Sequence, residues 1–275
     1  RKSSGYGMEY PKDIIVADKL GVVRTDSEKE YLAHLLCLGG TCRYRFNERD
    51  FELHAGDLSI IRKRKMVEKV EPSDDFRCKI IYATPGFIEL CTPQSNYGMK
   101  GSLALFLNPV MHLTPEQQIV CRRDFDLLEL RIRNKEHRFY QETLINAMQA
   151  AILDFFDFHA TLYGQSDIST QNASIMNRFL KMLEEGTYRE HREVSYYADC
   201  LCVTSKYLSE VSKKVSGYAA NYWINRYTIL DISRLLRDKS LTFVQISDMF
   251  GFSSPAYFSR YVQQNLGLNP TDYRK

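Results

Sequence analysis

The C-terminal part of the chain repeats itself with a period of 50 residues, and this repeat limits the possible folds more than any other feature. The matching pairs are Val194 with Val244, Tyr207 with Tyr257, Ser209 with Ser259 and Gly217 with Gly267. Each copy has the pattern of a short helix, a turn and a longer helix. Two copies are too few for a solenoid, so the sequence predicts a compact helical domain built from a duplicated motif.

The second copy shows where its helices begin and end. Phe243–Phe250 has the spacing of a short helix, and Gly251 permits the turn that follows. Ser254 and Pro255 then supply an N-cap and a first-turn proline for the longer helix. Between the copies, Asn221–Arg237 has the apolar spacing of one helix of about 17 residues, or roughly 25 Å. Such a spacer could set two helices near one DNA turn apart, about 34 Å.

The longer helix of each copy turns a polar face away from its apolar side. The outward side chains are Lys206, Ser209, Glu210 and Lys213 in the first copy, and Ala256, Arg260 and Gln263 in the second. Arg and Lys suit guanine edges and phosphates, Gln suits adenine, and a hydroxyl at a helix start can bond phosphate. For either helix alone, such a polar face could be an ordinary solvated surface. A polar face of this kind at equivalent places in both copies favours DNA contact instead. RNA binding is disfavoured because no exposed aromatic sheet is evident.

A family signature runs through the same segment. In the second motif it consists of Ile246, Ser247, Gly251, Phe252, Ser254, Tyr257, Phe258, Ser259, Arg260, Gly267, Pro270, Tyr273 and Arg274, and in the first of residues 204–209 with Gly217. Over about residues 172–275 the chain resembles the DNA-binding domain of the AraC/XylS family of bacterial transcription regulators. The resemblance implies a transcriptional regulator, not an enzyme, that binds double-stranded promoter DNA, with RNA polymerase as a candidate partner.

Helix geometry, capping and the resemblance together predict the residues that contact DNA. They are Thr204, Ser205, Lys206, Ser209, Lys213, Ser254, Pro255, Ala256, Arg260 and Gln263. Two positions depart from the family pattern. Glu210 stands where a basic residue is common, so it either reads a cytosine or weakens the first motif, and Ala256 offers no hydrogen bond.

The N-terminal part has the pattern of short strands separated by turns. The expected strands are Leu35–Leu38, Thr41–Phe46, Phe51–His54, Leu58–Ile61 and Phe76–Ala83. This spacing predicts a small antiparallel barrel or sandwich, and hence an α+β chain. Residues 51–58 with Ile60 and Ile61 resemble the cupin-like barrel that precedes this DNA-binding domain in many family members. That resemblance implies a small-molecule effector.

The interior of such a barrel is the predicted effector site. Tyr44 and Phe46 alternate with arginines along one strand, and Tyr82 could join them on the inner face. A small barrel can enclose one ligand among inward side chains. The alternative, that these side chains fill a closed core, stays equally open.

The middle of the chain is expected to be helical. Thr114, Pro115 and Gln117 form a capping-box start, and a second helix is expected over about residues 135–162. The apolar stripe of this second helix comprises Leu144, Met148, Ala151 and Phe155. It predicts the seam of a homodimer. Packing of the stripe on its own barrel is the open alternative.

Composition supports two domains in an ordinary globular chain. From Gln171 onward the chain carries 14 Lys and Arg against 10 Asp and Glu, whereas the remainder has 23 against 24, so the positive excess lies in the C-terminal part. We expect an effector and dimerisation domain at residues 8–163, a linker at 164–172 and a DNA-binding domain at 173–275. Neither a signal peptide nor a membrane span is evident, and the seven cysteines lack a disulfide framework, which predicts buried, reduced thiols in a cytoplasmic protein.

A cupin-type metal-dependent enzyme is the rival interpretation. It would need clustered His and carboxylate ligands, but His34 and His54 stand alone at their strand positions. The sequence therefore predicts no metal, no cofactor and no catalytic residue. The basic run at residues 62–65 is followed by acidic residues, which favours a solvated loop.

Overall fold

The structure is a computed structural model that describes residues 13–20, 31–93, 104–163 and 169–274. It divides into two compact units between Ser166 and Asp167. Of the predicted linker at 164–172, residues 164–168 lie outside the described residues, and helix α5 already begins at Thr170. Across the described stretches, every helix is too short or too polar to span a lipid bilayer.

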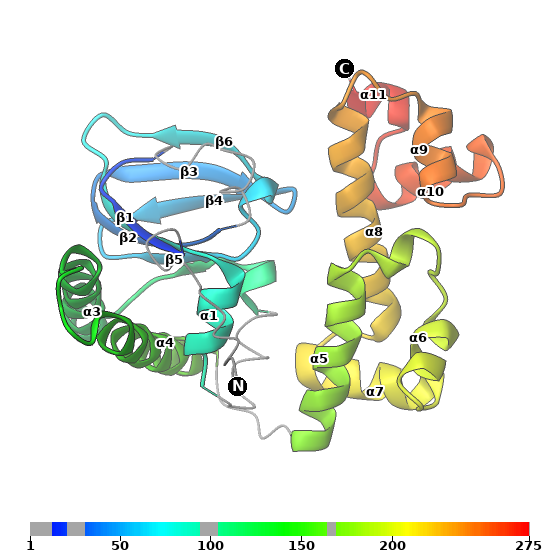
Figure 1. Cartoon of the computed structure of the whole chain (residues 1–275). Helices are drawn as coiled ribbons and strands as arrows, with labels where there is room; N and C mark the ends of the chain where they lie inside the picture. The colour runs from blue at the N-terminus through cyan, green and yellow to red at the C-terminus, as the bar shows by residue number, and fades with distance from the viewer. Residues whose placement is uncertain (1–12, 21–30, 94–103, 164–168, 275) are drawn as a thin grey trace, which may run out of the picture. The chain divides into compact units, whose positions relative to one another are not determined.

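The first unit contains two antiparallel sheets (Figure 1). The five-stranded sheet has the order β1-β7-β2-β5-β8, and the three-stranded sheet has the order β4-β3-β6. The strands are β1 Ile14–Ala17, β2 Leu32–Gly39, β3 Thr41–Phe46, β4 Arg49–His54, β5 Leu58–Ile61, β6 Val67–Pro72, β7 Arg77–Ala83 and β8 Val110–Met111. All five predicted strands are present, and helices follow them, which confirms the α+β class. Strands β1, β6 and β8 were not predicted.

Alternation along the strands gives this unit two apolar cores. On β2, Ala33, Leu35 and Cys37 face the core between the sheets, while Leu32 and Leu36 face the helices. The inner core is completed by side chains from both sheets, including Phe46 and Ile80. The outer core joins the five-stranded sheet to the helices. One sheet is therefore buried on both faces, which explains why β2 reads as a nearly continuous apolar run.

The α-helices of this unit whose two ends both lie in the described residues are α1 Pro85–Cys91, α3 Pro115–Arg133 and α4 Tyr140–Tyr163. The capping box at the start of α3 is confirmed, because Thr114 accepts from the backbone of Gln117 and the Gln117 side chain accepts in return from the backbone of Thr114. Helix α4 begins about five residues later than expected, after a turn in which the His137 ring accepts from the Phe139 N–H.

The proposed dimer seam is corrected by this packing. Leu144, Met148 and Ala151 are fully buried, and Phe155 is nearly so, within the outer core of their own chain. The apolar stripe of α4 packs against the sheet and α3, because one chain already supplies enough apolar surface to cover it. The open alternative was therefore right for this stripe.

The second unit is entirely helical in its described part. It contains α5 Thr170–Glu184, η4 Thr187–Arg189, α6 Val194–Cys200, α7 Ser205–Ser216, α8 Ala220–Arg237, α9 Phe243–Met249, α10 Pro255–Leu266 and α11 Pro270–Arg274 (Figure 1). Helix α8 confirms the predicted connecting helix. Its buried side chains include Trp223, Ile224 and Ile232, so it is the common core of both helix-turn-helix motifs.

The 50-residue offset between the two motifs holds for their second helices, which follow the turns, but not for their first helices. The recognition helices begin at Ser205 and Pro255, but the preceding helices begin at Val194 and Phe243, an offset of 49. The second turn is one residue longer, and its left-handed residue is Gly251 (φ 58°), whereas Cys202 (φ 57°) takes that conformation in the first. The pairing of Val194 with Val244 is therefore wrong in structural terms.

The cysteine prediction holds for five of the seven residues. Cys37, Cys42, Cys78, Cys91 and Cys121 are buried and free. Cys200 and Cys202 are free but exposed, because they lie at the end of α6 and in its turn, where a short helix has only one covered face. The prediction that these two are buried is wrong.

Candidate DNA interface

Helices α7 and α10 are built alike. Thr204 caps α7 by accepting from the Tyr207 N–H at 3.1 Å, and Ser254 caps α10 by accepting from the Tyr257 N–H at 3.2 Å. Each helix ends at a left-handed glycine, Gly217 (φ 81°) or Gly267 (φ 76°). The N-terminal end of each helix therefore combines free backbone N–H groups, the positive end of the helix dipole and a hydroxyl side chain. All three can interact with a phosphate group.

Burial confirms which face of each recognition helix points outward. Leu208, Val211 and Val215 are buried in α7, as are Phe258 and Val262 in α10. The predicted contact residues that are exposed are Thr204, Ser205, Lys206, Lys213, Pro255, Ala256, Arg260 and Gln263, whereas Ser209 and Ser254 are half-buried. The helices thus present the predicted residues on their accessible faces; contact of these residues with DNA stays a prediction.

The unusual Glu210 has a partner on its own helix. Its carboxylate lies 4.0 Å from the Lys206 ammonium one turn earlier, and both side chains are well exposed. The pair leaves α7 with less positive charge than Lys206 and Lys213 alone would give. When the helix meets phosphate, Lys206 can leave Glu210 at little cost, since exposed ion pairs are weak.

A buried carboxylate on α8 joins the connecting helix to the segment before the first motif. Asp231 Oδ2 accepts from Arg189 Nε at 2.8 Å and from the Tyr188 hydroxyl at 3.1 Å. Asp231 Oδ1 accepts from Arg234 Nη2 at 2.9 Å. Burial opposes ionisation of Asp231, but hydrogen bonds from Arg234 and Arg189 outweigh it and lower its pKa. We call Tyr188, Arg189, Asp231 and Arg234 the Asp231 cluster.

The same segment also touches the turn of the second motif. The Tyr188 and Phe250 rings stack with centroids 6.4 Å apart, and the Arg192 guanidinium lies 4.4 Å from the Phe252 ring centroid. Arg192 Nη1 also donates to the Phe250 carbonyl. These contacts connect residues about 60 positions apart, which explains why no local sequence pattern indicated them. They brace the two motifs as one body.

In the first unit, the proposed effector residues lie together inside the inner core. Tyr44, Phe46 and Tyr82 are all nearly fully buried between the sheets. The Tyr44 hydroxyl hydrogen-bonds to Ser59 at 2.9 Å, and burial raises the pKa of Tyr44 above its ordinary range. A cavity of this unit lies on the other face of the five-stranded sheet, between that sheet and the helices. Effector binding at these three residues stays a prediction.

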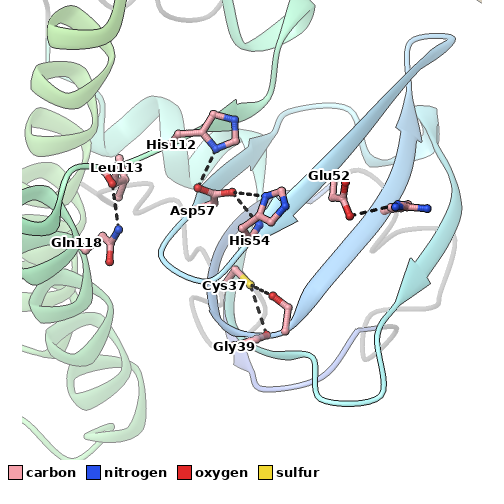
Figure 2. A network of polar contacts seen from close by, with 10 residues as sticks. Cys37, Gly39, Glu52, His54, Asp57, His112, Leu113 and Gln118 are labelled. Atoms are coloured by element: carbon pink, nitrogen blue, oxygen red, sulfur yellow. Dashed lines mark hydrogen bonds and ion pairs between the residues drawn. The ribbon is translucent and has the colours of Figure 1, made fainter.

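The histidine of the rival enzyme hypothesis has a partner that sequence spacing did not reveal. Figure 2 shows Asp57 between His54 and His112, with His112 Nδ1 at 2.9 Å from one carboxylate oxygen and His54 Nδ1 at 3.7 Å from the other. The second oxygen also accepts from the His54 backbone N–H at 2.8 Å. This carboxylate therefore ties the β4–β5 turn to the segment before α3. Within the described ranges, no group of three or more His, Cys, Asp or Glu residues could hold a metal ion.

Comparison with known proteins identifies the second unit. Residues 197–275 match a family model described as a helix-turn-helix domain. The C-terminal unit carries an AraC-type helix-turn-helix domain. The match covers both recognition helices α7 and α10 together with the connecting helix α8.

Curated relatives match stretches of 88 to 107 residues of this chain. The probable transcription factor PqrA of Proteus vulgaris is 24% identical over 103 residues, which cover 37% of this chain and 84% of PqrA. The uncharacterized HTH-type transcriptional regulator YisR of Bacillus subtilis is 27% identical over 88 residues, 32% of this chain and 31% of YisR. Histidine kinase P4 of Formosa agariphila is 25% identical over 107 residues, 39% of this chain but only 8% of the kinase.

Solved structures resemble the chain only distantly. ToxT from Vibrio cholerae O395 has a TM-score of 0.45 and 16% identity, with 89% of this chain and 88% of ToxT covered. The AraC-like transcriptional activator CuxR has a TM-score of 0.35 and 12% identity, with 80% of this chain and 73% of CuxR covered. At this level of likeness, neither protein informs the ligand of this chain.

Proposed function

We propose that this protein is a sequence-specific DNA-binding transcriptional regulator whose helices α7 and α10 read two segments of one promoter site. The observation that carries the proposal is the AraC-type domain with two capped, outward-facing recognition helices on one braced scaffold. Arg260 and Gln263 supply base-reading groups on α10, and Lys206 and Lys213 supply cationic groups on α7. The relatives named as transcription factors or regulators support the same class.

The two motifs are expected to contribute unequally. On α10 the exposed contact residues include Arg260 and no acidic side chain among those predicted, whereas α7 carries Glu210 beside Lys206. A carboxylate near phosphate is repelled, and it is tolerated next to a cytosine amino group. We therefore expect α10 to provide most of the affinity and α7 to select a narrower set of bases.

We further propose that the first unit makes the regulator a homodimer through α3. The exposed apolar side chains of α3 include Ile119, Leu127 and Leu130, and Ile119 is 71% exposed. In an antiparallel pair of α3 helices, Ile119 of one copy can face Leu130 of the other, and Glu116 can then lie near Arg133. A two-fold pairing of this kind is self-complementary. This surface replaces the α4 stripe in the dimer proposal.

An effector bound by the first unit and contact with RNA polymerase complete the proposal. The effector would act only if the two DNA-binding states of the protein bind it with different affinity. The cytoplasm is the expected location, since promoter DNA lies there in bacteria.

The experiment that tests the DNA-binding proposal is selection of bound duplexes from a random pool, with the full chain as bait and sequencing as readout. We expect two short conserved blocks, spaced as the two recognition helices require. Enrichment of no sequence over the starting pool would contradict the proposal. A pool selected with the Arg260→Ala variant provides the control, because it should lose one conserved position and keep the rest.

A further inference from the structure

The first unit contains a cavity of about 60 Å³ outside the inner core. It lies between the helix-facing side of the five-stranded sheet and helices α1 and α4. Its apolar wall includes Ile60 from β5, Ile88 from α1, and Ile152 and Phe155 from α4. A cavity with an apolar wall and a few convergent polar groups is the usual form of a small-molecule site.

The polar side of this cavity contains a buried histidine with an unsatisfied acceptor. His34, on β2, is 3% exposed, and its ring stacks on Phe155 with centroids 5.9 Å apart. Its Nδ1 is buried and has no hydrogen-bond partner. A buried polar atom in this state costs free energy unless something that enters the cavity bonds it.

The protonation state of His34 follows from its surroundings. Burial lowers the pKa of His34 to about 4, against the opposing effect of a hydrogen bond to the Ile81 backbone. Because the hydrogen bond to the Ile81 backbone favours the charged ring, the ring must be its donor. The proton of the neutral His34 ring is therefore on Nε2, and Nδ1 presents a lone pair. The cavity therefore offers an acceptor for a proton-bearing group.

The remaining polar lining residues carry positive charge or can hydrogen-bond. Arg62, His159 and Thr92 line the cavity with His34, and no acidic side chain is among the lining residues. A guanidinium binds a carboxylate strongly, and a neutral imidazole beside it accepts the acid's proton. An acidic headgroup with an apolar tail matches this distribution of charge.

The size of the cavity limits the length of that tail. One water molecule needs roughly 10–15 Å³ of such space, so 60 Å³ accommodates about four to six non-hydrogen atoms. Benzene occupies an engineered cavity of about 150 Å³, so an aromatic acid is too large. Propionic and butyric acid have the appropriate size.

We propose that this cavity binds a short-chain monocarboxylic acid, with its carboxyl group between His34 and Arg62 and its chain against Ile60, Ile152 and Phe155. This deepens the effector part of the proposed function, and only its regulatory consequence rests on that function. Helix α4 forms part of the wall and packs on α3, which carries the proposed dimer surface. Occupancy of the cavity can thus change the dimer, and through it DNA affinity.

The bound acid brings one proton with it. At neutral pH the free ligand is an anion and free His34 is neutral, so complex formation takes up one proton, which lies between Nδ1 and the carboxylate. Arg62 and His159 are the other charged or titratable groups in the lining, and the Arg62 guanidinium favours the anion. Affinity is therefore expected to fall as the pH rises above neutrality.

Isothermal titration of the full chain with sodium butyrate tests the inference, in two buffers of different ionisation enthalpy so that proton uptake is measured. We expect saturable binding, uptake of about one proton, and at least about tenfold weaker binding of 1-butanol, which has the chain without the acid. Arg62→Gln should weaken butyrate binding by a similar factor, since it removes the carboxylate partner. Arg49→Gln, an exposed arginine on β4 away from the cavity, should leave binding unchanged.

Several results would overturn the inference. They are equal binding of butyrate and 1-butanol, parental affinity in Arg62→Gln, no proton uptake, or no binding at all, in which case the cavity holds water only. Arg62 is exposed, so its variant is expected to fold, and thermal unfolding checks this. Binding of the same samples to selected duplex separates the two proposals, because each can fail while the other stands.

Discussion

The Asp231 cluster provides the sharpest test of how the two motifs are held together. The variant Asp231→Asn keeps the shape of the side chain and removes its charge. In the parent, Asp231 is 8% exposed and accepts from three donors. The variant leaves Arg189 and Arg234 without their anionic partner and turns an acceptor oxygen into an N–H₂ group that faces other donors.

The magnitude follows from burial on each side of the contact. Removal of one partner of a fully buried ion pair costs about 3–5 kcal/mol. Here Asp231 is buried, but Arg189 and Arg234 are 43% and 50% exposed, so water recovers part of the lost interaction. We expect the free energy of unfolding of the second unit to fall by about 2 kcal/mol, which lowers the urea midpoint by about 1 M.

The assay uses the single tryptophan of the chain. Trp223 lies fully buried on α8, so its fluorescence reports unfolding of the second unit alone. Asp248→Asn on α9 is the matched control, because this aspartate is exposed and its loss should change the midpoint little. The DNA readout is selection with the variant, which should keep each conserved block but accept more spacings between them.

The pH dependence of this effect has a definite sign. The folded pKa of Asp231 is lowered, so its contribution to stability is present above the unfolded pKa and disappears as the pH falls through the folded value. The difference between parent and Asp231→Asn should therefore shrink below about pH 4. If the variant were as stable as the parent at neutral pH, or kept the same spacing preference, the claim that the Asp231 cluster holds the two motifs together would be refuted.

Further predictions concern the interface, the dimer and a buried carboxyl group. Arg260→Ala should cost about 1–3 kcal/mol of specific DNA binding and relax one base position, and Lys206→Ala should act on the other half of the site; parental titrations for both would contradict the face assignment. Ile119→Asp with Leu130→Asp should yield a folded monomer by light scattering, whereas Leu144→Asp should unfold the first unit; a dimer that survives the α3 pair would exclude that surface. Burial and the neighbouring Asp154 raise the pKa of Asp124, so stability from its protonated form is lost as the pH rises through that pKa. Asp124→Asn should therefore stabilise the chain more at about pH 8 than at about pH 5, and an equal effect at both would refute the raised pKa.

The sequence predicted those features that depend on local rules. The capping box at Thr114, the cap at Ser254, and the outward faces of α7 and α10 all follow from spacing within one or two helical turns. The buried strands β2 and β7 were predicted from the pattern of short strands separated by turns. Strand β6 was not, because it is largely exposed and charged and is held by pairing with β3.

The features that were missed depend on contacts between distant residues. Periodicity showed the apolar stripe around Leu144, but not whether a second chain or the same chain covers it. Asp57 joins His54 to His112 across more than 50 positions, and Asp231 reaches Arg189 across 42. The cavity beside His34 lies on the opposite face of the sheet from Tyr44, Phe46 and Tyr82, and one strand's alternation alone could not say which face encloses space.

The central claim is that α7 and α10 bind a specific duplex, and one titration tests it most directly. The full chain is titrated with its selected duplex and with a scrambled duplex of the same composition, between about 50 and 200 mM salt. The account predicts tighter binding of the selected duplex at every salt concentration, a steep loss of affinity with salt, and loss of most of the preference in Lys206→Ala with Arg260→Ala. Equal affinity for both duplexes, or a preference that survives in the double variant, would contradict it.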